Sequence, residues 1–426
     1  MDNGVMSSSH GDAAERRASR VAAMLGVPEF VYGQPVVPTG SGIREVGDGI
    51  LLCGFGGAIL QVKARGRREG LADSDDAACR WIRKHSAKAV RQGRGSKRTI
   101  TSFQTRGNPL TAVPVRSMVL SGDQRKQFHV RLDEDCSDWP VIVVIAHPRT
   151  PELILPFHDD VFYVTMEDWH LLNHHLRSVH EVLRYVRLVL ENGSTLEVPL
   201  GREGLRFRAL ASMYLNDDRP HRSSVAPISF AAVHAPSAVA AYRDLIDKTA
   251  AENDDSTGFV ATDYREILDY LDDVPAAVQA NVGQRLMRWH DELQSTRSMV
   301  SGSALLKDRL LVYMADFDSN QPDKKKWLAT LGMLTALRQI EWSERVSKSG
   351  AVLGVGVRFS DGDLVEYSYI LVRGGSKIST QDRRRLEWAF GVSNFSTFHA
   401  RRPRVARNEL CPCGSSLKYK RCHGRR

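Results

Sequence analysis

Four potential metal ligands lie close together at the end of the chain. Cys411 and Cys413 are separated by one residue, and Cys422 and His423 follow as a pair after eight more. Three thiolates and one imidazole suit tetrahedral coordination of zinc. Because protein groups would fill every coordination position, the predicted zinc ion is structural rather than catalytic. A segment this short cannot bury a core, so metal binding must supply its folding free energy.

This segment resembles the SEC-C motif, the zinc-binding tail of the bacterial preprotein translocase ATPase, which also ends many unrelated bacterial proteins. The resemblance covers about residues 406–424 and matches all four ligand positions of the family. Six other residues match its framework: Asn408, Pro412, Gly414, Ser415, Lys418 and Tyr419. The resemblance implies a zinc-binding interaction module, and it says nothing about the rest of the chain. The alternative is a chance clustering of cysteines.

Length and composition place the rest among soluble globular proteins. A chain of 426 residues suggests two or three domains, and 42% hydrophobic with 26% charged residues is ordinary. The apolar run 141–146 is too short to span a membrane, and residues 1–4 do not begin a secretory signal. Cys53, Cys79 and Cys136 are too few for a disulfide framework. We therefore expect a cytoplasmic protein.

The net charge of +9 is concentrated in two segments. Residues 401–426 hold nine basic residues against Glu409 alone, and residues 79–98 hold eight basic residues and no acid. Runs of charge are most often solvated faces. Two such blocks in one chain nevertheless favour a polyanionic partner, with nucleic acid as the main candidate.

Hydrophobic periodicity and turn residues predict alternating helices and strands. The predicted helices are 13–25, 76–92, 165–190, 263–270, 275–293, 324–339 and 379–390. The predicted strands are 49–53, 58–64, 112–120, 141–146, 309–315, 351–359 and 364–372. We expect Asp75 or Asp76 to cap the second helix and Gly93 to end it. Its apolar stripe is predicted to consist of Ala78, Trp81, Ile82, His85 and Ala89.

The first two strands form a predicted hairpin with chemically useful side chains. If Cys53 pairs with Ala58, Asp48 lies opposite Lys63 and Ile50 lies opposite Gln61. Gln61 and Lys63 are two residues apart in one strand, so they face the same way. The hairpin therefore gathers an acid, an amide and an ammonium at one end of a sheet.

These groups could bind Mg²⁺. The Asp48 carboxylate, the Gln61 side-chain oxygen and the Val62 carbonyl are hard oxygen ligands of the kind that this cation prefers. A cation there would polarise a phosphate and acidify an attacking water, which Lys63 would orient. The alternative is an ordinary cross-strand ion pair between Asp48 and Lys63, worth a few tenths of a kcal/mol.

The pattern resembles the PD-(D/E)XK nuclease superfamily, in particular its Mrr-like restriction endonuclease branch, in which Gln replaces Glu. Asp48, Gln61 and Lys63 fall on its three motif positions, although Gln61 removes one negative charge from the metal site. The resemblance covers residues 13–145 and implies the element order αβββαβ. Glu15 and Glu45 are candidates for an additional acid.

The flanking helix of that fold corresponds to residues 76–92, where Lys88, Arg91 and Gln92 match. The resemblance implies Mg²⁺ or Mn²⁺ as cofactor and DNA or RNA as substrate. Four basic residues of this helix are predicted to contact phosphates: Arg83, Lys84, Lys88 and Arg91.

We thus predict an α/β protein with a PD-(D/E)XK-like nuclease core, a second α/β domain and a small zinc module. The expected boundaries are 1–12 (disordered), 13–195 (nuclease-type domain with helical extension), 225–395 (second domain), 396–405 (basic linker) and 406–426 (zinc module). The predicted function is metal-dependent phosphodiester hydrolysis by a bacterial endonuclease. The alternative is a non-enzymatic adaptor whose tail docks on a chaperone, a ribosome or secretion machinery.

Overall fold

The computed structural model divides into two compact units, which are described separately. The first comprises Met1–Val233 with Asp272–Ala277, and the second comprises His234–Leu271 with Val278–Arg426. The described residues are 10–25, 27, 30–39, 42–66, 74–106, 110–115, 128–130, 136–215, 236–251, 261–274, 276–296, 300–306, 309–317, 324–346, 351–360, 363–373, 378–390, 392–394, 399–401, 407–408 and 417–421.

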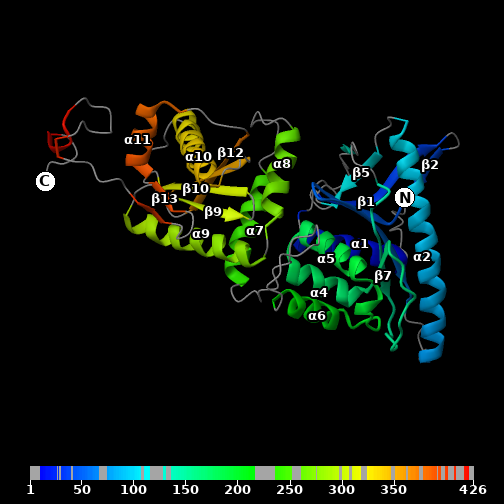
Figure 1. Cartoon of the computed structure of the whole chain (residues 1–426). Coiled ribbons are helices and arrows are strands. Elements are labelled where there is room, and N and C mark those ends of the chain that lie inside the picture. Colours follow the sequence, from blue (N-terminus) through cyan, green and yellow to red (C-terminus); the bar gives the residue numbers. More distant parts are fainter. Residues whose placement is uncertain are drawn as a thin grey trace, which may run out of the picture. The chain divides into compact units, whose positions relative to one another are not determined.

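The first unit is a mixed sheet with helices on both faces (Figure 1). Its strands are β1 (Val31–Thr39), β2 (Gly42–Glu45), β3 (Gly49–Cys53), β4 (Gly56–Ala64), β5 (Leu110–Pro114), β6 (Phe128–Val130), β7 (Val141–Ala146) and β8 (Val161–Thr165). Its helices are α1 (His10–Leu25), α2 (Asp75–Gln104), α4 (Met166–Leu176), α5 (Val179–Asn192), the 3₁₀ helix η2 (Gly193–Leu196) and α6 (Glu203–Leu215).

The strand order is β6-β5-β1-β3-β4-β7-β8, and β2 pairs with β1. β3 is antiparallel to both β1 and β4, whereas β4, β7 and β8 run parallel to one another. Between β4 and β7 the chain crosses over through α2, which covers one face of the sheet. α1, α4 and α5 cover the other face (Figure 1). β7 consists almost entirely of Val and Ile and is buried from Val141 to Ile145, as expected for a strand covered on both faces.

The β3–β4 hairpin has a tighter turn than the sequence predicts. Cys53 pairs with Gly56, not Ala58, so the loop contains only Gly54 and Phe55. The predicted pairing is therefore wrong by two residues: Ile50 lies opposite Ile59 rather than Gln61. The glycine that this turn requires is Gly56, the first residue of β4, whose φ of 124° a residue with a side chain rarely adopts. A shift of two residues leaves every side chain on its predicted face.

The predicted bounds of α2 and of the helix 165–190 are also wrong. α2 begins after the cap Ser74 rather than after Asp75 or Asp76, and it continues through Gly93 to Gln104. Gly93 serves packing instead: a Cβ there would lie 2.4 Å from Cγ1 of Val141. The predicted helix 165–190 is two helices, because Arg177 adopts φ 56° and Ser178 caps α5. Thr165 caps α4 as its sequence indicates.

The second unit has its own sheet, in the order β12-β11-β10-β9. Its strands are β9 (Val300–Leu306), β10 (Arg309–Phe317), β11 (Val352–Ser360) and β12 (Asp363–Val372), and β13 (Val392–Asn394) pairs separately with β14 (His399–Arg401). Its helices are α7 (Pro236–Ala251), α8 (Ala261–Asp272, whose last residue groups with the first unit), α9 (Ala276–Thr296), α10 (Lys324–Val346) and α11 (Thr380–Phe390).

In this second unit β10 and β11 are parallel and are joined through α10. Trp327 and Leu331 of α10 pack with Leu310 and Val312 of β10 in one apolar cluster. Gly356 of β11 allows this close approach, because a Cβ there would lie 2.8 Å from the Trp327 ring. The unit therefore has a core of its own.

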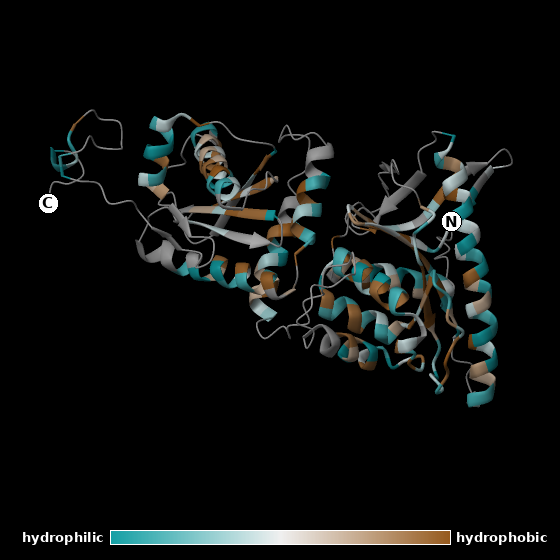
Figure 2. Cartoon of the chain, viewed as in Figure 1, coloured by the Kyte–Doolittle hydropathy of each residue, from teal (hydrophilic) through white to brown (hydrophobic). Residues whose placement is uncertain are grey.

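Hydropathy follows this layering in both units. In Figure 2 the central strands are largely hydrophobic, and the helices carry hydrophobic and hydrophilic sides. No described helix is long and apolar enough to cross a membrane. Of the predicted disordered segment 1–12, residues 10–12 belong to α1 and residues 1–9 lie outside the described residues. The four predicted zinc ligands, Cys411, Cys413, Cys422 and His423, also lie outside them. Within the tail, Tyr419–Arg421 form the 3₁₀ helix η3, and the Lys420 N–H donates to the Arg407 carbonyl at 3.0 Å.

Candidate functional site

Asp48 is held rigidly where the chain enters β3. Its backbone N–H donates to the Leu60 carbonyl at 3.1 Å. Its Oδ2 accepts a 2.6 Å hydrogen bond from the Val62 N–H of β4. The preceding Gly47 has φ +124°, which a residue with a side chain rarely adopts. The turn into β3 thus directs the Asp48 carboxylate onto β4.

The Lys63 ammonium is surrounded by three oxygen atoms. Its Nζ lies 3.5 Å from Oδ2 of Asp48, 3.5 Å from Oε1 of Gln61 and 2.9 Å from the Val62 carbonyl oxygen. Gln61 is almost fully buried, and the side chains of Asp48 and Lys63 are only 16% and 14% exposed. The structure therefore brings together Asp48, Gln61 and Lys63. The three oxygens are those that the sequence indicates as Mg²⁺ ligands.

Two further carboxyl groups belong to the same electrostatic environment. Burial first, and then the charges of Asp48 and Glu45, raise the pKa of Glu15, on α1, to about 7, with Lys63 opposing the rise. Burial followed by the charge of Asp48 also raises the pKa of Glu45, at the end of β2. The ligand atoms of these acids are not gathered within 4.8 Å of one another. The charge of Asp48 nevertheless contributes to the raised pKa of both predicted extra acids, Glu15 and Glu45.

The oxygens of Asp48, Gln61 and Val62 suit a hard cation better than a soft one. The atoms around the Lys63 ammonium are all oxygens, and no thiol or imidazole is among them. Such a set is typical of Mg²⁺ or Mn²⁺ sites rather than of zinc sites. The set is also rich in acid, because three carboxyl groups share the field of one lysine. The ammonium now lies where a divalent cation would find the same ligands.

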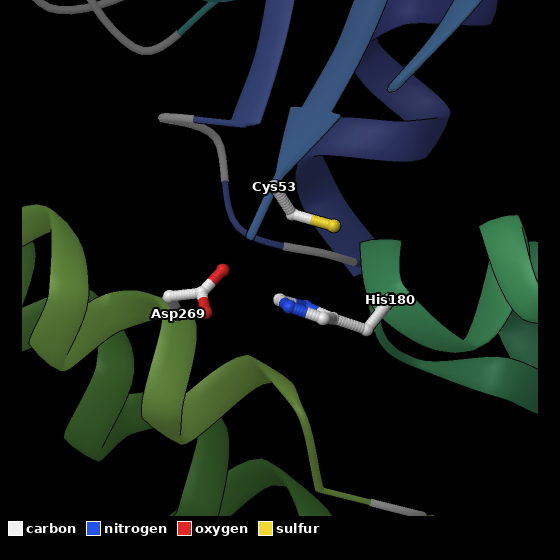
Figure 3. Close-up of side chains that lie close together, drawn as sticks. All are labelled: Cys53, His180 and Asp269. Carbon is white, nitrogen blue, oxygen red and sulfur yellow. The ribbon is translucent and has the colours of Figure 1, made fainter. Parts of the chain in front are cut away.

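A second pair of possible ligands in the first unit consists of Cys53, at the end of β3, and His180, at the start of α5. Their side chains lie close together in Figure 3, with ligand atoms within 4.8 Å. His180 Nδ1 is 2.9 Å from Oδ2 of Asp272, which also accepts from the Val179 and His180 N–H groups. The third residue of Figure 3, Asp269, belongs to the second unit. Two ligand atoms from the first unit are too few for a metal site. The His180 ring instead contacts the Asp272 carboxylate that accepts hydrogen bonds from the first N–H groups of α5.

Three of the four predicted phosphate contacts share one side of α2. Arg83, Lys84, Lys88 and Arg91 are all exposed. At about 100° per residue, Lys84, Lys88 and Arg91 lie within about 60° of one another around the axis, whereas Arg83 lies on another side. The rest of the basic block is partly structural. Arg94 makes two hydrogen bonds to the Asp160 carboxylate, at 2.6 and 3.0 Å, and Lys97 lies 3.8 Å from it.

An aromatic pair on α2 was not predicted from the sequence. Trp81 and His85 are placed in the predicted apolar stripe, but both are only half-buried, whereas Ala78, Ile82 and Ala89 are buried. Their rings stack with centroids 4.2 Å apart and an interplanar angle of 20°. The signal that could have revealed the pair is the i, i+4 spacing of two aromatic rings among exposed lysines.

Comparison with known proteins identifies the tail. Residues 407–425 match the SEC-C motif family. The chain is 33% identical to protein translocase subunit SecA of Burkholderia pseudomallei strain 1106a over 85 residues, which is 20% of this chain and 9% of that protein. It is 78% identical to SecA of Albidiferax ferrireducens over 23 residues, covering 5% of this chain and 2% of that protein. The matched part thus spans less than a tenth of these relatives. No solved structure matches the chain.

Proposed function

We propose that the first unit is a metal-dependent nuclease of the PD-(D/E)XK type, Mrr-like in its Asp48, Gln61 and Lys63. The observation that carries this proposal is the group of three oxygens around the Lys63 ammonium, with Glu15 and Glu45 nearby. An ordinary cross-strand ion pair needs one acid. Glu15 and Glu45 add two carboxyl groups to the electrostatic environment of Asp48, and a divalent cation there would favour their ionised forms.

The order of elements supports the same proposal. Along the chain, α1, β1, β3, β4, α2 and β7 follow in the order αβββαβ. The three strands β1, β3 and β4 form an antiparallel meander, and β7 returns parallel to β4 after α2. This arrangement brings the Asp48 end of β3 next to Gln61 and Lys63 of β4. β2, β5, β6 and β8 extend the sheet beyond those elements.

In this mechanism each residue has a distinct task. Asp48, the Gln61 amide oxygen and the Val62 carbonyl would hold Mg²⁺ or Mn²⁺, and Glu15 and Glu45 would supply the negative charge that Gln61 lacks. A bound cation would polarise the scissile phosphate and lower the pKa of a water molecule. Lys63 would orient that water for attack on phosphorus, with cleavage of one P–O ester bond. Lys84, Lys88, Arg83 and Arg91 bind phosphates of DNA or RNA.

Cleavage assays test this proposal. Zinc-loaded wild type should cleave plasmid, single-stranded DNA or RNA when Mg²⁺ or Mn²⁺ is added. Asp48→Ala and Lys63→Ala should each lower the rate by at least about a hundredfold, because each removes a group from the reacting centre. The matched control is Glu167→Gln, an exposed acid in the first turn of α4. Equal cleavage by all four proteins, or none by the wild type, would contradict the proposal.

A second candidate function rests on the tail. The matched SEC-C residues 407–425 and the SecA similarity favour a zinc-binding module that docks on a protein partner. In a pure adaptor of this kind, cytoplasmic and bacterial, the β3–β4 hairpin is only scaffold. Removing residues 407–426 separates the two functions. A nuclease should keep its cleavage activity without the tail, whereas an adaptor should lose partner binding and show no divalent-cation-dependent turnover.

A further inference from the structure

Trp81 and His85 form a half-exposed aromatic stack on α2. The two residues are four apart, and their rings are nearly parallel at 4.2 Å. The Trp81 ring also lies 5.1 Å from the His147 ring, at 50°. His147 directly follows β7, and its Nδ1 lies 2.6 Å from the Arg149 carbonyl oxygen. The stack is thus fixed at the end of β7 rather than free on the helix.

Exposed positive charge lies on the same side of the helix as this stack. At about 100° per residue, Lys84, His85 and Lys88 all lie within about 60° of Trp81 around the axis, whereas Arg83 lies about 160° away. Lys84 and Lys88 are exposed. This side of α2 therefore combines aromatic rings with two cations.

The stack also lies beside the candidate nuclease site. Burial lowers the pKa of His85, and the charges of Lys84, Lys88, Lys63 and Arg65 lower it further. Lys63 pairs with Ile145 of β7, two residues before the His147 that lies against Trp81, so the stack and the Lys63 cluster lie at the same end of the sheet. A lowered pKa keeps the imidazole neutral at pH 7, as a stacking partner for a base should be.

Aromatic rings flanked by cations are the features that bind single-stranded nucleic acids. A base can stack on such a ring only when it is unpaired, because both faces of a paired base are covered within the duplex. Each stacked base contributes sequence-tolerant affinity, and neighbouring lysines contact its phosphates. An acidic protein could satisfy the lysines, but it would make no use of the rings.

We propose that the Trp81–His85 stack receives an unpaired base of a single-stranded nucleic acid, with Lys84 and Lys88 on the flanking phosphates. This inference rests on the proposed nuclease function and gives it a substrate class: single strands or frayed ends presented to Asp48, Gln61 and Lys63. DNA and RNA share the base and phosphate chemistry that the stack would recognise.

Binding without turnover tests the stack. Zinc-loaded full-length protein, with no added Mg²⁺ or Mn²⁺, is titrated against labelled single strands of DNA and RNA, a hairpin duplex and a DNA strand of equal length made of abasic sites. The wild type should bind the strands with bases more tightly than the abasic strand or the duplex. The DNA and RNA arms show which sugar is preferred.

Substitutions on α2 test which side chains cause the preference for strands with bases. Trp81→Leu keeps an apolar side chain against the core and should weaken binding to the strands with bases about tenfold, with little change on the abasic strand. His85→Ala should act in the same direction, and it decides the matter if Trp81→Leu unfolds. Arg83→Ala, on another side of α2, should affect strands with and without bases equally.

Three results would overturn the stacking proposal: wild-type binding to the abasic strand as tight as to the strand with bases, wild-type affinity in both aromatic variants, or equally effective competition by polyglutamate. Cleavage by the same variants keeps the two proposals distinct. Asp48-dependent cleavage without a preference for strands with bases would refute the stacking proposal and leave the nuclease proposal standing. Base-dependent binding without cleavage would refute the nuclease proposal and leave base stacking standing.

Discussion

At the scale of single residues, the central feature is a lysine ammonium among oxygens that could hold a cation. Nζ of Lys63 makes its shortest contact, 2.9 Å, with a carbonyl oxygen rather than with the Asp48 carboxylate at 3.5 Å. Nζ thus lies among three oxygens rather than in a simple contact with the Asp48 carboxylate.

A further acid with a perturbed pKa, Glu203, lies elsewhere in the first unit. Glu203, at the start of α6, is almost fully buried and accepts hydrogen bonds from Tyr185 Oη at 2.5 Å and from Arg206 at 3.0 Å. Burial raises its pKa from 4.5 to about 7, while Arg206 and the Tyr185 hydrogen bond oppose that rise. Glu203 therefore stays protonated in the folded protein at pH values where the unfolded chain is ionised.

This perturbation predicts a loss of stability as the pH rises. The contribution of Glu203 is fully present below pH 4.5, declines as the pH rises towards 7, and is lost above 7. The total change is on the order of 1–3 kcal/mol. Thermal unfolding from pH 4.5 to 8 measures it, with Glu203→Gln as the variant that should show a flatter profile. Identical pH profiles for the two proteins would contradict the assignment.

At the scale of elements, α2 shows how one residue decides a boundary. Gly93 predicts the end of a helix, yet the helix continues because the glycine lies against Val141 of β7. Glycine within a helix costs about 1 kcal/mol, and the close packing of α2 on the sheet offsets this cost. The helix gains eleven further residues beyond Gly93, which include Ile100 of the apolar cluster under β3.

Two glycines of α2 provide a matched comparison. Gly93→Ala should destabilise the protein by about 1–3 kcal/mol, because its Cβ would lie 2.4 Å from a Val141 methyl carbon. Gly95→Ala should be neutral or stabilising by up to about 1 kcal/mol, since the nearest atom to its Cβ is the end of Arg98 at 3.9 Å. Unfolding in denaturant measures both. Equal effects of the two substitutions would refute the packing role of Gly93.

The elements also show what the sequence can predict. Alternation in β4 predicts correctly that Gln61 and Lys63 share a face, because the side-chain period of a strand is two. The pairing partner depends on loop length, which Gly54-Phe55-Gly56-Gly57 leaves open, so the register is missed by two residues. β1 is missed because Gly33 and Pro35 interrupt its pattern; its pairing with β5 shifts between Gly33 and Val36.

Site residues from distant segments were harder to predict. Glu15 and Glu45 come from α1 and β2, and only the folded sheet brings them into the field of Asp48. The resemblance to the nuclease superfamily suggested Glu15 and Glu45 as additional acids, whereas their spacing in the sequence could not have indicated them. The Trp81–His85 stack was not predicted, although both residues belong to one helix. Helical periodicity assigns both to the apolar stripe, and only the folded structure shows that they are half-exposed.

At the scale of the whole molecule, the chain forms two units with separate cores, and the second unit ends in a segment that matches a known module. The match covers residues 407–425. A segment of this length depends on its metal for folding. The predicted ligands Cys411, Cys413, Cys422 and His423 should therefore act as a set, and losing one should release the metal.

Metal analysis tests this prediction. The purified wild type should contain one zinc ion per chain, and Cys413→Ser should contain none, because three ligands hold zinc far more weakly than four. Cys79→Ser, which changes a free cysteine of α2, is the matched control and should keep its zinc. Since the units have their own cores, Cys413→Ser should unfold at the same temperature as the wild type. Zinc retained in Cys413→Ser would refute the ligand set.

The most direct measurement for the whole account is Mn²⁺ binding, read from the electron paramagnetic resonance signal of the free ion in titrations of zinc-loaded protein. The account predicts one Mn²⁺ site in the wild type and in the control Glu167→Gln, and no site in Asp48→Asn. It also predicts tighter binding in Lys63→Met, where no ammonium competes for the oxygens. Equal binding by Asp48→Asn and wild type, or no binding by the wild type, would contradict the cation site on which the proposed nuclease depends.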